Sequence, residues 1–171
     1  LEDRVRLVEL NETLQLADTP VARWATPIDD ILYRCNHDSM NLHAEALLKS
    51  IGRAITGERG TWQNGAAVLR MLMVETLGVS DVAGAIIRDG SGLSRENRVT
   101  AATLSAWLAA MHRRPAVGDM YHRTLPTDDG KLARRFSFGQ IEHDVYAKTG
   151  TIKHVRALSG YVVAPETGRA A

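Results

Sequence analysis

Apolar residues recur at steps of three and four positions through the middle of the chain, which is the spacing of one helical face. The first run predicts a helix with its apolar positions within residues 40–55. Asp38 or Ser39 is expected to cap its start, because short polar side chains favour that position. Gly57 is expected to end it, because glycine adopts the left-handed backbone that often closes a helix.

Two further runs follow the same spacing. One predicts a helix over residues 64–77 that ends at Gly78, and the other predicts a helix that Thr100 caps and that runs to His112. Between these runs, residues 82–87 are small and β-branched, which predicts a short buried strand, although the glycine within it weakens the pattern.

Strand-like patterns stand near both ends of the chain. Weak alternation of apolar and polar residues predicts strands within residues 1–17, and two stronger runs predict strands over residues 145–149 and 156–164 with a short turn between them. The connecting segments are expected at residues 20–27, 89–94 and 113–139. Helices in the middle and strands at the end indicate the α+β class, with an antiparallel sheet and helices packed on it.

Composition excludes several classes of protein. The 171 residues suit one globular domain, since 44% are hydrophobic and 24% are charged. A net charge of +1 predicts no nucleic-acid partner. No apolar run approaches the ~18 residues of a transmembrane segment, and no signal-peptide pattern is visible, although a trimmed chain would look the same. The single cysteine, Cys35, excludes an internal disulfide, and the six histidines lack the spacing of metal ligands.

Two short motifs carry the candidate chemistry. Ser39 and Asn41 form an S-x-N motif at the start of the first predicted helix, and Lys148, Thr149 and Gly150 form a K-T-G motif on a predicted strand. Taken singly, the serine is an ordinary helix cap and the lysine an ordinary solvated strand residue. Taken together, a hydroxyl beside an amide offers a proton shuttle, while the lysine, hydroxyl and glycine offer a close grip on a carboxylate.

The order and separation of four segments make these motifs more specific. The segments are residues 36–45, 89–95, 147–151 and 156–161. In this order the chain resembles the D-alanyl-D-alanine carboxypeptidase/endopeptidase family, the class C low-molecular-mass penicillin-binding proteins of peptidase family S13. The resemblance extends from about Trp24 to Ala164 and implies a partial domain of the penicillin-binding-protein and serine β-lactamase fold.

The resemblance implies a role for each motif residue. Ser39 would pass a proton to the departing amine, Asn41 would bind the substrate carbonyl, and Lys148 would hold the terminal carboxylate. The remaining positions of the strand would bind substrate with it, namely Thr149, Gly150 and the backbone N–H of Thr151. The implied partners are peptidoglycan stem peptide and β-lactams, outside the cytoplasmic membrane (periplasmic or extracytoplasmic), with no metal or organic cofactor.

The chain departs from the family pattern in one respect. The family nucleophile lies in an S-x-x-K motif upstream of S-x-N, and none of the serines here is followed three residues later by lysine. The expectation is therefore that residues 1–171 are the C-terminal portion of the domain, cut short at both ends and inactive alone.

No other residue takes the nucleophile's place. Ser91 lacks the first glycine of a G-x-S-x-G elbow, and Cys35 lacks an identifiable third catalytic group. Two alternatives to the enzyme remain: a non-catalytic module that binds cell-wall peptide, and an unrelated α+β binding domain with chance motifs.

Overall fold

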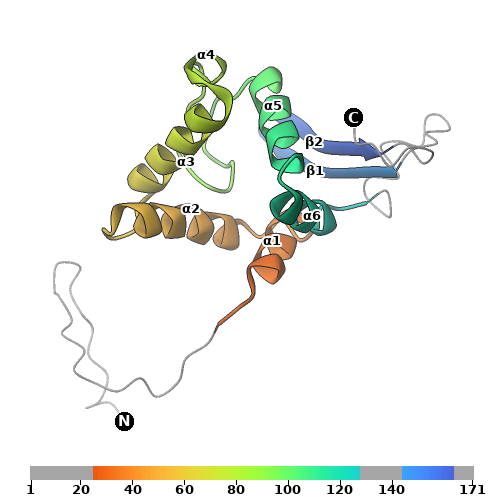
Figure 1. Cartoon of the computed structure of the whole chain (residues 1–171), viewed down its shortest axis with the longest axis horizontal. Coiled ribbons are helices and arrows are strands. Elements are labelled where there is room, and N and C mark those ends of the chain that lie inside the picture. The colour runs from red at the N-terminus through yellow and green to blue at the C-terminus, as the bar shows by residue number, and fades with distance from the viewer. Residues whose placement is uncertain (1–24, 128–143, 164–171) are drawn as a thin grey trace, which may run out of the picture.

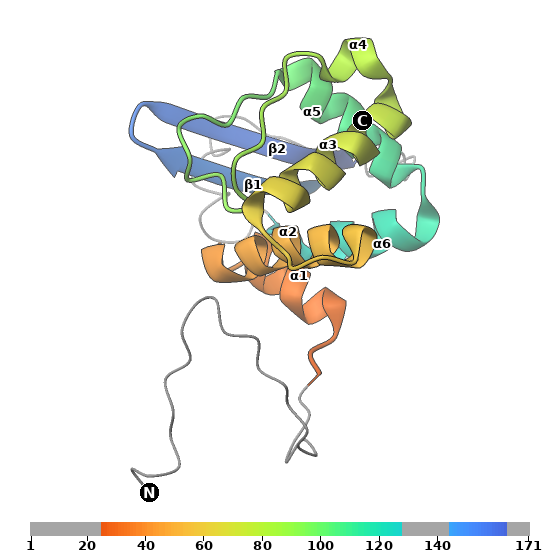
Figure 2. The same ribbon diagram turned by 90° about the vertical axis from the view of Figure 1, so that its left-hand side faces the viewer.

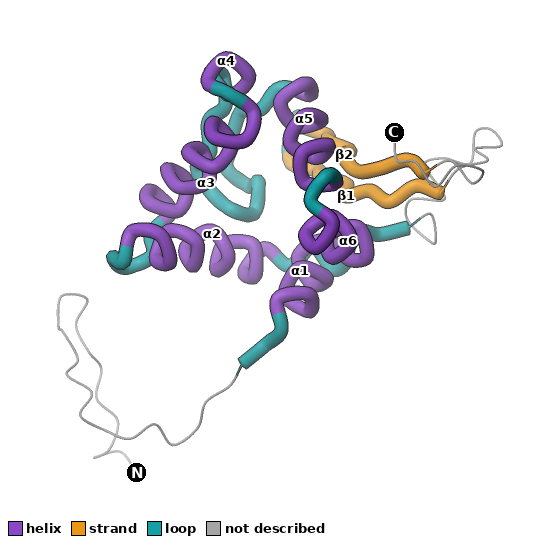
Figure 3. Tube along the Cα trace, in the orientation of Figure 1, coloured by secondary structure: helices purple, strands orange, loops and turns teal. Residues whose placement is uncertain are grey.

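The computed structural model describes residues 25–127 and 144–163, and all structural statements concern these ranges. Along the chain the elements are α1 (Ile28–Asn36), α2 (Asn41–Thr56), α3 (Trp62–Leu77), α4 (Val79–Val82), α5 (Ala101–His112), α6 (Pro115–Thr124), β1 (Asp144–Ile152) and β2 (Val155–Val163). Helices α2 to α5 follow one another around one part of the molecule, and the hairpin of β1 and β2 lies beside α5 and α6 (Figure 1). Figure 3 shows the same division between helices and strands.

The three predicted helices are present as α2, α3 and α5. Gly57 ends α2 with a left-handed φ of 73°, as predicted. The predicted cap of α2 is wrong, because the helix begins at Asn41 with Met40 at the N-cap and without a side-chain capping bond. Asp38 instead pairs with Arg34 at 2.7 Å. Ser39 makes a contact across the molecule that is described below.

The caps of the next two helices show how local sequence sets a boundary. Helix α3 begins two residues before the predicted position, since Thr61 accepts a hydrogen bond from the backbone N–H of Asn64 and the Asn64 side chain accepts one from Thr61. This reciprocal pair places Asn64 inside the first turn. The Thr100 side chain caps α5 as predicted, accepting from the Thr103 N–H at 3.0 Å.

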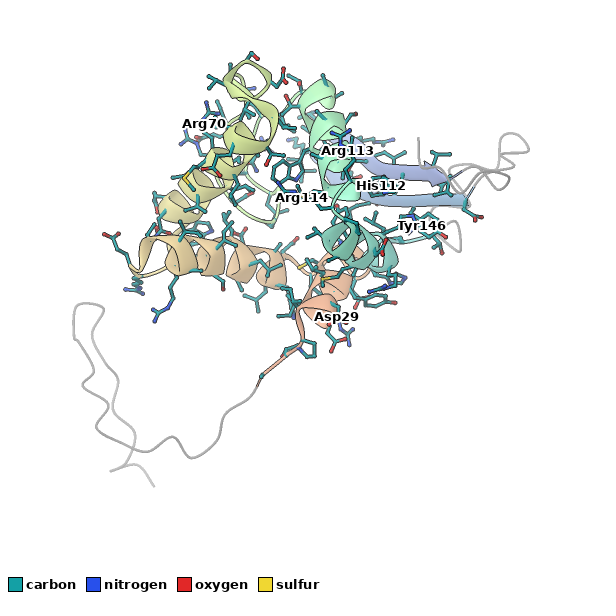
Figure 4. All side chains as sticks on the ribbon, in the orientation of Figure 1. Asp29, Arg70, His112, Arg113, Arg114 and Tyr146 are labelled. Carbon is teal, nitrogen blue, oxygen red and sulfur yellow. The ribbon has the colours of Figure 1, made fainter. Side chains whose placement is uncertain are left out.

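The strand predicted over residues 82–87 is wrong. The segment contains the end of α4 and then a single bridge between Ile86 and Arg98. Val82 is fully buried and packs with Met73 of α3. Arg70 of α3 donates to two carbonyl groups of the segment, those of Val82 and Ala85, so these groups are satisfied by a side chain rather than by a sheet (Figure 4).

Besides α4, two longer helices were not predicted. Residues 113–139 are expected to be irregular, yet α6 occupies Pro115–Thr124, with its proline in the first turn where the missing N–H costs nothing. Helix α1 follows directly after Pro27. The strands predicted within residues 1–17 lie outside the described residues, as do most of the first connector and the end of the third.

The predicted hairpin is confirmed; β1 extends beyond both of its predicted ends, and β2 begins one residue before its predicted start. β1 and β2 are antiparallel, with Lys148 opposite Ser159. Tyr161 of β2 is buried with Leu108 of α5 and Leu125, and its hydroxyl donates to the Leu108 carbonyl at 2.9 Å. An antiparallel sheet with helices packed on it is the α+β arrangement that the element order predicts.

Helices α2 and α3 approach closely at Gly65. A Cβ added there would collide with the Leu48 carbonyl of α2, so Gly65→Ala is expected to force the helices apart and to lower the free energy of unfolding by about 1–3 kcal/mol. Urea unfolding measures this change. Gly84→Ala is the control, because Gly84 has open space around it and no left-handed backbone. Equal stability of the two variants would contradict this packing.

The contact of α6 with the hairpin is expected to make stability depend on pH. The rings of His122 and Tyr146 lie 3.8 Å apart between centroids; Figure 4 labels Tyr146 on the hairpin. Burial, and then the charge of His112, lower the pKa of His122 below its ordinary 6.5. The unfolded chain therefore binds a proton more readily, so this contribution is complete above pH 6.5 and is lost as the pH falls through the lowered pKa.

Thermal unfolding from pH 7.5 to pH 5 measures this effect. His122→Phe is expected to reduce the fall in stability over that range, because the variant has no proton to bind at this position. The control is His154→Asn, which changes an exposed turn histidine and keeps a residue type that tolerates the left-handed φ of 69° there. An unchanged pH dependence in His122→Phe would contradict the assignment.

Candidate active site

A cleft of about 590 Å³ lies between the start of α2, the loop before α5 and the hairpin. Figure 2 shows that loop beside the free end of the hairpin and above α2. The motif residues all line this cleft: Ser39, Asn41, Lys148, Thr149, Gly150 and Thr151. The S-x-N and K-T-G segments therefore come together at one site, although they lie far apart in the sequence.

Lys148 and Ser39 meet directly across the cleft. The lysine Nζ donates to the Ser39 Oγ at 2.7 Å, over a separation of 109 residues. The same Nζ donates to the Thr149 carbonyl at 2.7 Å, which holds the side chain along its own strand. Because the two motifs share one chemistry, the sequence predicts that Ser39 and Lys148 face each other across one cleft, and the bond confirms this prediction. The arrangement joins a cation to a hydroxyl that can relay a proton.

Ser39 reaches this position through an unusual backbone. Its φ is 56°, in the left-handed region that residues with a side chain rarely adopt. The turn that contains it is held by a hydrogen bond from the Met40 N–H to the Arg34 carbonyl at 3.0 Å. Nearby, the Asn36 amide donates to the Thr124 hydroxyl at 2.8 Å and ties the end of α1 to α6. The surrounding fold thus holds a strained residue in place.

This backbone leads to a stability prediction for two variants that both lack the hydroxyl. Ser39→Gly is expected to be more stable than Ser39→Ala by roughly 1 kcal/mol, because glycine occupies the left-handed region without strain from a Cβ. Urea unfolding of both variants tests this difference. An alanine variant as stable as the glycine variant would show that the turn relaxes to another backbone conformation.

Asn41 and the K-T-G strand complete the polar lining. Asn41 is the exposed first residue of α2, and its side-chain amide has no hydrogen-bond partner among residues 25–127 and 144–163. The amide is therefore available to a ligand. A Cβ at Gly150 would make only an ordinary 3.6 Å contact with Ala157, so the fold itself does not require this glycine. That the glycine serves the approach of substrate stays a prediction.

The loop before α5 forms another wall of the cleft. The Asp89 carboxylate accepts from the N–H groups of Gly92 and Ser94 and from the Asn97 amide, at 2.8, 2.5 and 2.7 Å. These bonds close the loop on itself, in agreement with the prediction of a connecting segment at residues 89–94. Sequence reasoning assigned no role to Glu45, whose carboxylate contacts this loop.

Two other cleft residues were considered as nucleophiles. The Ser91 hydroxyl donates to Glu45 at 2.5 Å, and burial raises the pKa of the Cys35 thiol, which disfavours the reactive thiolate. His37, the histidine nearest to Cys35 in the sequence, stacks on Tyr33 with ring centroids 4.6 Å apart.

In the described ranges, no three His, Cys, Asp or Glu side chains gather as a metal site. No described helix combines the length and apolar character needed to cross a membrane.

Comparison with known sequences now identifies the family. The sequence profile of the D-Ala-D-Ala carboxypeptidase 3 (S13) family matches residues 6–171, and the chain belongs to this family. A D-alanyl-D-alanine carboxypeptidase from an Actinomadura species is 40% identical over 152 residues, which cover 81% of this chain and 26% of that protein. Carboxypeptidase DacB from Mycolicibacterium smegmatis is 29% identical over 160 residues, which cover 85% of this chain and 32% of that protein.

A solved structure is similar as well. Penicillin binding protein 4 from Haemophilus influenzae, crystallised with a β-lactam, superposes with a TM-score of 0.64 at 26% sequence identity. The match covers 80% of this chain and 32% of that protein. The likeness confirms the predicted α+β fold of the penicillin-binding-protein type. The chain spans about a quarter to a third of the length of these relatives.

Proposed function

We propose that this chain supplies the S-x-N and K-T-G side of the active site of a serine-type D-Ala-D-Ala carboxypeptidase/endopeptidase. The observation that carries the proposal is the 2.7 Å bond between Lys148 and Ser39 in a cleft that Asn41 also lines. Family membership supports the same reading. The proposed substrate is the stem peptide of peptidoglycan, which places the site of action outside the cytoplasmic membrane, and β-lactams are the proposed inhibitors.

The nucleophile is proposed to come from sequence outside this chain. No serine in the 171 residues has a lysine three positions later, the arrangement that the chemistry of this family needs for activation. The relatives that match this chain are about three times as long, so they have room for that segment. The chain alone is therefore proposed to be inactive.

In the proposed reaction, the serine oxygen attacks the carbonyl carbon between two D-alanine residues, while the lysine of the S-x-x-K motif takes the proton of the serine hydroxyl and passes it to Ser39. The C–N bond breaks, the terminal D-alanine leaves as the amine, and Ser39 passes it the proton that it needs. Water then attacks the acyl-enzyme ester and releases the shortened peptide. Lys148 and Thr149 hold the terminal carboxylate, because a cation and a hydroxyl together make charge-assisted hydrogen bonds.

Two other groups act on the substrate carbonyls. Asn41 donates to the substrate carbonyl on the acyl side and orients the lysine of the S-x-x-K motif. The backbone N–H of Thr151, with that of the nucleophilic serine, stabilises the oxyanion, a contribution worth about 3 kcal/mol at such sites.

Release of D-alanine from a peptide ending in D-Ala-D-Ala tests the proposal. A polypeptide that joins this chain to its S-x-x-K segment is expected to release D-alanine, and penicillin is expected to stop the release. The absence of S-x-x-K keeps one alternative in view, a non-catalytic module for cell-wall peptide. That alternative predicts binding of the peptide without release, and it would replace the enzyme if the joined polypeptide bound but did not cleave.

A further inference from the structure

The Glu45 carboxylate gathers an unusual number of donors beside the cleft. One oxygen accepts from the Trp62 indole N–H at 2.8 Å and from the Gly90 N–H at 3.0 Å. The other accepts from the Ser91 N–H at 3.2 Å and from the Ser91 hydroxyl at 2.5 Å. Burial alone would raise the pKa of Glu45, yet these hydrogen bonds outweigh it and hold the pKa below the ordinary value, so the group is a carboxylate at neutral pH.

The Glu45 carboxylate lies between the helix that carries Asn41 and the loop that forms one wall of the cleft. Glu45 follows Asn41 by four residues in α2, which places the two side chains on the same face of the helix. Its partners Gly90 and Ser91 line the cleft, but Glu45 itself does not. The carboxylate therefore connects the helix that carries Asn41 to the cleft wall without facing the cleft.

The loop of residues 89–97, called the wall loop, is otherwise held mainly by hydrogen bonds among its own residues. Asp89 closes it internally, as described above. At Gly90 the loop backbone lies so close to α2 that an added Cβ would collide with the Ala44 carbonyl. The contact of Gly90 with Ala44 sets the distance between the loop and α2. The directional hydrogen bonds to Glu45 set the position of the loop along the axis of α2.

We propose that Glu45 is a positioning residue, whose carboxylate locks the wall loop at Gly90 and Ser91 to helix α2 and so sets the distance between that wall and Asn41. This role deepens the proposed function and rests on it. A displacement of about 1 Å at a substrate-positioning element can cost roughly 100-fold in rate, which is why one carboxylate outside the cleft matters to the reaction inside it.

A competing chemistry uses the same atoms. A serine hydroxyl bonded to a glutamate resembles a nucleophile with its base. A carboxylate with four donors and a lowered pKa is a weak base, however, and it favours the fixed hydrogen bond over proton transfer. An acyl adduct mapped to Ser91 would overturn the positioning role.

Hydrogen–deuterium exchange tests the lock in this chain without any assay of activity. Glu45→Gln is expected to speed exchange of the Gly90 and Ser91 amides about tenfold or more, because an amide side chain turns an N–H group toward donors. Glu58→Gln, an exposed carboxylate just after α2, is the matched control and is expected to change nothing. Unchanged exchange in Glu45→Gln would overturn the proposal.

The second measurement is peptide cleavage by the polypeptide that also carries the S-x-x-K segment. Glu45→Gln is expected to lower kcat/KM about tenfold, and Glu45→Asp to recover part of the loss because it restores the charge. Ser91→Ala, which removes only one of the four donors, is expected to lose less. If Glu45→Gln destabilises the fold, kcat/KM of Glu45→Asp and Ser91→Ala is compared with that of the wild type instead.

The outcomes separate the two proposals. Wild-type cleavage with equal rates in all the Glu45 variants would overturn the positioning role and leave the proposed function standing. A wild-type polypeptide that neither cleaves nor reacts with penicillin would overturn the proposed function, and the catalytic part of this role with it.

Discussion

Replacing Lys148 by alanine is expected to slow acylation by penicillin roughly 30- to 150-fold in the polypeptide that carries the nucleophile. Lys148 donates to Ser39 at 2.7 Å and, in the proposed function, also holds the carboxylate of the ligand. A charge-assisted hydrogen bond of this kind contributes about 2–3 kcal/mol, and alanine removes it while leaving the nucleophile intact. The second-order rate of labelling by a fluorescent penicillin measures the loss.

Two further variants show whether the loss comes from position as well as from charge. Lys148→Arg keeps a cation, but a planar guanidinium cannot reproduce the bond from a single nitrogen to Ser39, so an intermediate rate is expected. Lys153→Ala removes a lysine from the turn of the same hairpin, outside the cleft, and is expected to label like the wild type. A Lys148→Ala variant that labels at the wild-type rate would exclude this lysine from ligand binding.

Local sequence predicted the elements whose boundaries are set by their own residues. Thr100 caps α5 and Gly57 closes α2 because each bond or backbone angle lies within a few positions of the helix end. The hairpin was predicted for a related reason, since strand alternation and a short turn are local features. Helix α6 was missed because it has only ten residues and contains Pro115 and Gly118, two residue types that are typical of loops.

The motif residues were predicted to meet because the two motifs share one chemistry. The contact of Ser39 with Lys148, 109 residues away, bears this out, although a serine before a helix is most often a cap. Glu45 shows the limit of this reasoning, since it belongs to neither motif and its partners Gly90 and Ser91 lie 45 and 46 residues further on. Its contacts leave no periodic signal in the sequence, so only the folded chain brings them to light.

The 171-residue chain alone is expected to form no stable adduct with a fluorescent penicillin, whereas the polypeptide that includes the S-x-x-K segment is expected to label to completion. Covalent capture needs a serine hydroxyl with a base placed one helical turn away, and no serine of this chain has that lysine. A denaturing gel after boiling measures the adduct, because an acyl-enzyme ester survives denaturation and a reversibly bound ligand does not.

The control for this comparison is the longer polypeptide with the serine of its S-x-x-K motif replaced by alanine, which is expected to behave like the 171-residue chain. Labelling of the short chain would require a nucleophile among its own residues, and mapping the modified peptide would identify it. Ser91 and Cys35 are the residues to inspect, because both line the cleft that holds Lys148. An unlabelled short chain and a labelled long one, with the label lost in the alanine variant, would assign the reacting oxygen to the serine of the added segment.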